Sequence, residues 1–133
     1  ESNRHKLEWN VSRTLAKVNY RIHTDAIKEK LIPEKLPKSK IQLVYASEAD
    51  LLNVALFGLT AKEWRDQNPD LDGNIRDQST IEQLVVLSNM ESINAMLIQQ
   101  GLPQPERLKQ LNELAIQQMK SLLKSPSTKK LNN

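Results

Sequence analysis

One stretch decides the fold class, residues 79–100, which read STIEQLVVLSNMESINAMLIQQ. Ser79 followed three residues later by Glu82 matches a capping box at a helix N-terminus, and Gly101 supplies a helix end. Between them, apolar residues recur around most of the helix circumference instead of along one stripe. A helix without a broad polar face is usually surrounded by other elements. The stretch therefore predicts a largely buried central helix.

Two amphipathic helices flank the central one in sequence. Residues 7–31 carry an apolar stripe at spacings of three and four and end before Pro33. Pro103 and Pro105 introduce a second striped helix, which ends at residues 125–126. The first stripe consists of Leu7, Val11, Leu15, Val18, Ile22 and Ala26. The second consists of Leu108, Leu111, Leu114, Ala115, Met119 and Leu122.

The segment after the first helix is predicted to be extended. Pro33 and Pro37 disfavour helix and indicate a basic connector through residue 40. Residues 41–45, IQLVY, alternate briefly between apolar and polar and predict a short strand or an extended lead-in. No second alternating run offers such a strand a partner.

Two further capping boxes predict the remaining helices. Ser47 with Asp50 marks the start of a helix that Gly58 ends, and Thr60 with Glu63 marks a short one. We therefore expect an all-α domain over residues 1–124, a compact bundle of about five helices with at most one short strand-like segment. Residues 125–133 are polar, and we expect them to form a frayed tail.

Composition limits the class of protein more than its function. The 133 residues contain no cysteine, which excludes disulfides and thiolate metal sites. No apolar run approaches the roughly 20 residues that cross a bilayer, so we expect a cytoplasmic protein without membrane contact. Lys and Arg number ten against five acids in residues 1–40, three against nine in 41–100, and six against two in 101–133. An acidic middle between basic ends predicts internal pairing or a basic surface for a polyanion.

The clearest candidate surface is the basic face of the first helix. At about 100° per residue, one face collects cations with two polar residues between them. We consider that such a row of cations tracks a phosphate backbone, in which case the affinity would fall steeply with salt. A solvated helix face and a face that pairs with the acidic middle block are the alternatives. The candidate nucleic-acid-binding residues are Asn10, Arg13, Lys17, Arg21 and Lys28, and Thr24 lies between them on the same face.

Three other patterns fall short of a functional site. His23 and Asp25 lie two residues apart on a helix and so do not face each other. Residues 68–75 place Asn and Asp as in a calcium-binding EF-hand loop, but Ser79 stands where the bidentate Glu is needed. Residues 51–67 have the outline of a helix-turn-helix, with acids in the second helix that oppose DNA binding. No catalytic fingerprint is present, so we expect no enzyme, metal, cofactor or small-molecule substrate.

Several stretches together resemble a known protein family. They are residues 13–27, residues 55–65 with the following Asn-Pro-Asp-Leu, and residues 73–77 leading into Glu82-Gln83-Leu84. This pattern, spanning roughly residues 7–123, resembles the C-terminal region of bacterial and phage proteins that carry an N-terminal KilA-N DNA-binding domain. The family's own DNA-binding segment has no counterpart in this chain, so its DNA-contact residues cannot be placed here.

The resemblance implies a companion domain of a phage- or prophage-type DNA-binding regulator. The leading expectation is a non-enzymatic interaction or oligomerisation domain, with self-association or a protein as the partner. The alternative is direct binding of nucleic acid through the basic face of the first helix.

Overall fold

The structure is a computed structural model that describes residues 2–124 of the chain. In this part it contains five helices and no strand, which confirms the all-α prediction. They are α1 (Ser2–Leu31), α2 (Lys38–Phe57), α3 (Ala61–Gln67), α4 (Ile81–Gln99) and α5 (Gln104–Lys124). The polar tail expected at residues 125–133 lies outside the described residues.

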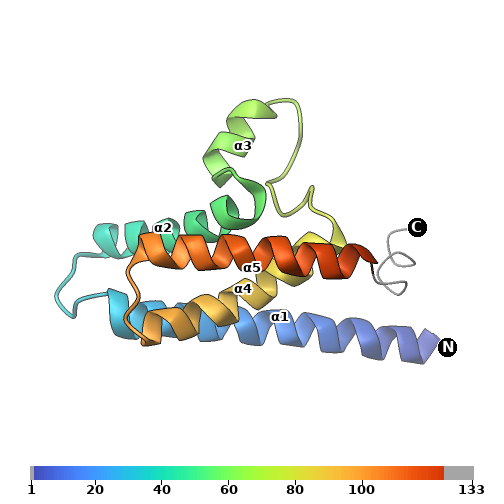
Figure 1. Ribbon diagram of the computed structural model, residues 1–133, viewed down its shortest axis with the longest axis horizontal. Coiled ribbons are helices and arrows are strands. Elements are labelled where there is room, and N and C mark those ends of the chain that lie inside the picture. Colours follow the sequence, from blue (N-terminus) through green and yellow to red (C-terminus); the bar gives the residue numbers. More distant parts are fainter. Residues whose placement is uncertain (1, 125–133) are drawn as a thin grey trace.

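The four long helices form a bundle, and α3 projects from the end of α2 (Figure 1). Helices α1 and α4 run parallel to each other, and α2 and α5 run in the opposite direction (Figure 1). The long helices contact one another as α1 with α4, α2 with α5, α4 with both α2 and α5, and, less extensively, α1 with α2. Helix α4 is thus the element around which the others pack, as the sequence predicted.

Two apolar clusters form the core, and α4 contributes to both. The larger joins α2, α4 and α5, with Leu52, Met90 and Leu111 at its centre and essentially inaccessible to solvent. The smaller joins α1, α4 and the beginning of α2, where Ala26 and Ile27 pack with Ala95 and Ile98. Because residues on several sides of α4 are buried, this helix needs apolar side chains around most of its circumference.

The prediction of a short strand or extended segment at residues 41–45 is wrong, because these residues lie within α2. Helix α2 already begins at Lys38, with Pro37 as its N-cap in an extended conformation. Val44 and Tyr45 lie about one turn after Ile41, and both pack against the smaller core cluster. Their β-branched and aromatic character favours a strand only weakly, and packing against α1 overrides that preference.

The helix caps agree with the sequence at some ends and not at others. Thr60 and Glu63 form the predicted capping box, and Gly58 ends α2 with φ 77°. The box of α4 is shifted by one residue, to Thr80 with Gln83, because Ser79 instead donates to the carbonyl of Ile75 at 2.6 Å. The box predicted at Ser47 is wrong, since this residue lies within α2.

Within residues 2–124, no single helix combines the length and the apolar character that crossing a membrane requires. Helices α2 and α3 pass that test only together, and they meet at a 59° bend.

Candidate functional site

The predicted basic face lies along the outside of α1. Asn10, Arg13, Lys17, Arg21 and Lys28 are all exposed. Arg21 lies 3.9 Å from Asp25, one turn further along the helix, and the Arg13 guanidinium stacks on the Trp9 ring at 4.9 Å. Among the residues described, no cation of α1 forms an ion pair with the acidic middle block. Internal pairing therefore does not account for this face in the described chain.

A groove of about 340 Å³ runs between the basic face and α4. Arg13, Lys17 and Tyr20 line it from α1, and Arg76 precedes α4 on the opposite wall. Glu91 lies at its base, buried, with its carboxylate 4.0 Å from the Arg76 guanidinium. Burial raises the pKa of Glu91, and the Arg76 charge opposes this only partly. The rim of the groove is cationic, which suits an anionic ligand and disfavours a cationic one.

The apolar stripe of α1 does not face the core along most of its length. Only Ala26 of the six predicted residues is buried. The face that packs on α4 instead carries Asn19, His23 and Ile27, roughly 120° around the helix from the stripe. The exposed fractions of the remaining five are 63% for Leu7, 50% for Val11, 58% for Leu15, 46% for Val18 and 43% for Ile22.

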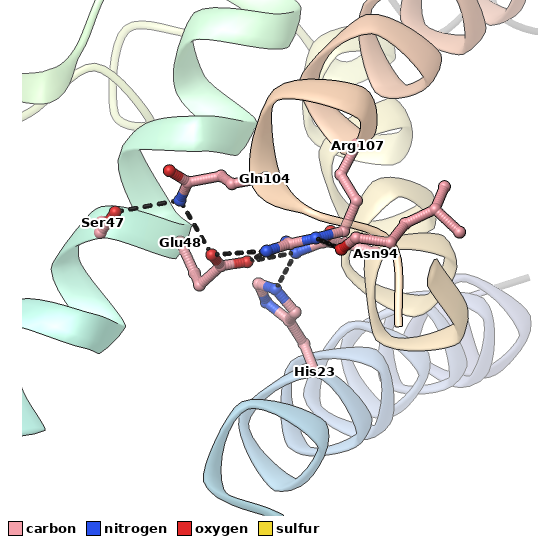
Figure 2. Close-up of polar contacts among 7 residues, drawn as sticks. His23, Ser47, Glu48, Asn94, Gln104 and Arg107 are labelled. Atoms are coloured by element: carbon pink, nitrogen blue, oxygen red, sulfur yellow. Dashed lines mark hydrogen bonds and ion pairs between the residues drawn. The ribbon is translucent and has the colours of Figure 1, made fainter. Parts of the chain in front are cut away.

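A buried polar network, absent from the sequence predictions, connects the four long helices (Figure 2). It brings together His23 of α1, Glu48 of α2, Asn94 of α4 and Arg107 of α5, none of them more than 4% exposed. Arg107 donates to both Glu48 carboxylate oxygens, the longer contact being 3.2 Å, and to Asn94 Oδ1 at 2.9 Å. Gln104 donates to the second Glu48 oxygen at 2.9 Å.

The network sets the charge state of its members. Asn94 Nδ2 donates to His23 Nε2 at 2.8 Å, which places the imidazole proton on Nδ1 in the neutral ring. Burial lowers the pKa of His23 to about 4, so the ring is neutral at pH 7. Burial alone would raise the pKa of Glu48, but hydrogen bonds from Arg107 and Asn94 outweigh it and lower that pKa. Glu48 and Arg107 are therefore an ionised pair inside the bundle.

This geometry supports a structural role for the network. Each polar group of Glu48 and Asn94 bonds to another member, and the Arg107 Nε donates to the carbonyl of Leu102 at 2.9 Å. The hydrogen-bonding groups of Glu48 and Asn94 are thus engaged inside the bundle. The pattern that signalled it was available in the sequence, because Asn94 interrupts the apolar run of α4 and Arg107 lies one turn before Leu111 on the α5 stripe.

The loop compared with a calcium site is held by its own side chains. Asn74 Oδ1 accepts from the backbone N–H groups of Arg76 and Asp77, and Asp77 Oδ2 accepts from that of Asn74. Across residues 2–124, no three His, Asp or Glu side chains are grouped so as to hold a metal ion. The second helix of the helix-turn-helix outline, α3, has seven residues and no buried side chain.

Comparisons of the chain with family models, with curated proteins and with solved structures give no match.

Proposed function

We propose that this domain is a non-enzymatic interaction module that self-associates or binds a protein through the apolar stripe of α1. The observation that carries the proposal is the exposure of Leu7, Val11, Leu15, Val18 and Ile22 on one side of one helix. Single exposed apolar residues are ordinary on a protein surface, whereas contiguous patches mark interaction sites. The resemblance to the region that follows KilA-N domains supports a cytoplasmic role within a phage-type DNA-binding regulator.

The stripe has the energy of a reversible contact. Full burial of a Leu, Ile or Val side chain contributes about 1.5–3 kcal/mol. Since these five side chains are already about half covered, a partner adds about 1 kcal/mol for each, or about 5 kcal/mol per stripe. Association costs about 4–15 kcal/mol of translational and rotational freedom. The free energy gained by burying two facing stripes is therefore similar in size to the cost of association. This similarity predicts a weak, concentration-dependent complex.

Light scattering over about 1 µM to 1 mM tests the proposal, because this range spans the affinities of weak complexes. We expect the apparent mass to rise with concentration and Leu15→Asp to weaken that rise at least tenfold in concentration, about 1.4 kcal/mol. Ile116→Asp on α5 is the matched control, because Ile116 is 49% exposed and outside the stripe. A strict monomer that also captures no protein partner in a pull-down would refute the proposal.

A second candidate function is binding of nucleic acid through the basic face. The observation favouring it is that Lys17 and Lys28 are exposed without an ion pair among the described residues. Arg13→Glu combined with Lys17→Glu should abolish a salt-sensitive shift of DNA or RNA, and Lys109→Glu on α5 is the control. Four phosphate contacts predict a slope of about −3 to −4 for log K against log salt. Absence of binding at low salt would end this alternative.

A further inference from the structure

The outer four residues of the exposed α1 stripe are placed symmetrically about its centre. Counting outward from the bond between Thr14 and Leu15, Val11 corresponds to Val18 and Leu7 to Ile22. Each pair joins aliphatic residues of similar size at equal distance from the midpoint. Two copies of this helix lying antiparallel would therefore bring aliphatic residues together at both of these pairs, while at the centre Leu15 of each copy would lie beside Thr14 of the other, close to the twofold axis.

Charges at the two ends of the stripe select the antiparallel direction. Arg4 continues the stripe beyond Leu7, and Asp25 continues it at the same distance beyond Ile22. A parallel pair would place Arg4 beside Arg4 and Asp25 beside Asp25, whereas an antiparallel pair places each cation against an anion. Both side chains are free to re-pair, since they are 83% and 62% exposed and have only exposed partners one turn away, Glu8 and Arg21.

Within residues 2–124, nothing covers the N-terminal turns of α1, and residues 3–11 are all exposed. Asn19 donates to Ser88 Oγ at 2.9 Å, and Ala26 packs in one cluster with Ala95. In both contacts the α4 residue comes 69 positions after the α1 residue in the sequence. Because the two helices are parallel, Ile81, the first residue of α4, lies beside about Ser12 of α1. The turns before that level extend past the end of α4 (Figure 1) and expose Leu7 and Trp9. A short helical extension without tertiary contacts is marginal in water, and an antiparallel second copy would supply those contacts.

Helix α4 widens the apolar surface at the midpoint of the stripe. With the same offset, Gln83 and Leu84 are the residues of α4 that lie beside Thr14 and Leu15 of α1. Ile81 and Val85 bracket these two residues and are each 42% exposed. They lie on the side of α4 turned away from Leu87 and Glu91, which line the groove below the basic face. The surface is thus broadest where a twofold axis would cross it.

We propose that a second copy of this chain covers the stripe, with the two α1 helices antiparallel about a twofold axis that passes between Thr14 and Leu15. This inference rests on the proposed function and adds to it the identity of the partner and the geometry of the contact. In this arrangement Val11 of one copy contacts Val18 of the other, and Arg4 of one pairs with Asp25 of the other.

Single cysteines test the register directly, because the chain has none of its own. An equimolar mixture of Val11→Cys and Val18→Cys should form a disulfide-linked dimer on mild oxidation, and Leu15→Cys should link to itself. Val11→Cys alone should not, since its two thiols would be seven residues apart along the axis, roughly 10 Å. Non-reducing electrophoresis reads the outcome, and circular dichroism verifies that each variant, changed at an exposed position, remains helical.

A charge exchange tests the orientation independently. Arg4→Glu or Asp25→Arg alone should raise the dimer Kd about three- to thirtyfold, because each creates like-charge contacts at both ends of the interface. The double variant should restore the Kd to within about threefold of the original. It does not repair the contacts with Glu8 and Arg21 inside each copy, so rescue reports pairing between copies.

The outcomes separate this inference from the proposed function. Self-linking of Val11→Cys, or failure of the charge exchange to rescue a dimer, would overturn the antiparallel register while the interaction function stands. A chain that remains monomeric to 1 mM in the light-scattering series of about 1 µM to 1 mM would overturn the second copy as partner and leave the stripe to a different protein. A monomer that also captures no partner would overturn both.

Discussion

Replacing Arg107 with Met is the sharpest test of the buried network. The variant keeps a long unbranched side chain in the same space but removes the guanidinium that neutralises Glu48. It also removes the donors for Asn94 Oδ1 and for the carbonyl of Leu102. A carboxylate and two acceptors are then left inside the bundle without their partner.

The cost follows from the burial of the pair. Arg107 and Glu48 side chains are 3% and 4% exposed, so screening by water does not reduce their interaction. Removing one partner of a buried ion pair costs about 3–5 kcal/mol, and the orphaned acceptors place this variant toward the upper end. For a domain of this size the loss corresponds to a fall in melting temperature of about 10–20 °C.

Urea unfolding followed by circular dichroism measures the change in the free energy of unfolding. Arg65→Met on α3 is the control, because Arg65 is exposed and should change stability by less than about 0.5 kcal/mol. Adding Glu48→Leu to Arg107→Met should recover part of the loss, since an apolar pair replaces an unpaired charge. A loss below about 1 kcal/mol in the single variant would refute the reasoning, because the carboxylate would then have to be solvated in the folded state.

Three further predictions concern pH, caps and turns. Because the folded-state pKa of His23 is about 4 against 6.5 when unfolded, stability should be flat above pH 6.5 and fall by up to about 3 kcal/mol as the pH drops from 6.5 to 4. His23→Gln should flatten that part of a melting profile relative to the parent, and an unchanged slope would contradict a buried neutral imidazole. Thr80→Ala should cost about 1 kcal/mol through loss of the α4 cap, whereas Ser47→Ala should stay within about 0.5 kcal/mol, and chemical denaturation distinguishes the two. Gly101→Ala should cost about 1 kcal/mol or more at φ 79° although nothing obstructs the added Cβ, and equal stability would contradict the left-handed turn.

Much of the fold follows from local signals. The capping box at Thr60 and the helix ends at Gly58 and Gly101 depend on residues within one turn of each other, and the structure has all three. The buried central helix was likewise visible in residues 81–100, because its apolar residues leave no polar face. The start of α2 was predicted wrongly, at Ser47 instead of Lys38. Residues 41–45 carry a weak strand preference, and packing of Val44 and Tyr45 against α1 decides their conformation.

The candidate surfaces divide in the same way. The basic face of α1 needed only helical periodicity, since Arg13, Lys17 and Arg21 are neighbours on one helix. The polar network could not be predicted as a unit, because Glu48 and Arg107 are 59 residues apart and meet only when α2 and α5 pack together.

The amino-acid sequence by itself determined the class of fold, the number of helices and the presence of an apolar stripe on α1. Periodicity, however, shows that a helix has an apolar side and does not show what covers it. Only the tertiary structure decided that α1 packs on α4 through Asn19, His23 and Ile27, because the His23–Asn94 hydrogen bond and the small residues Ala26 and Ala95 let the two helices meet at that face. The stripe from Leu7 to Ile22 was thereby left exposed and available to a partner.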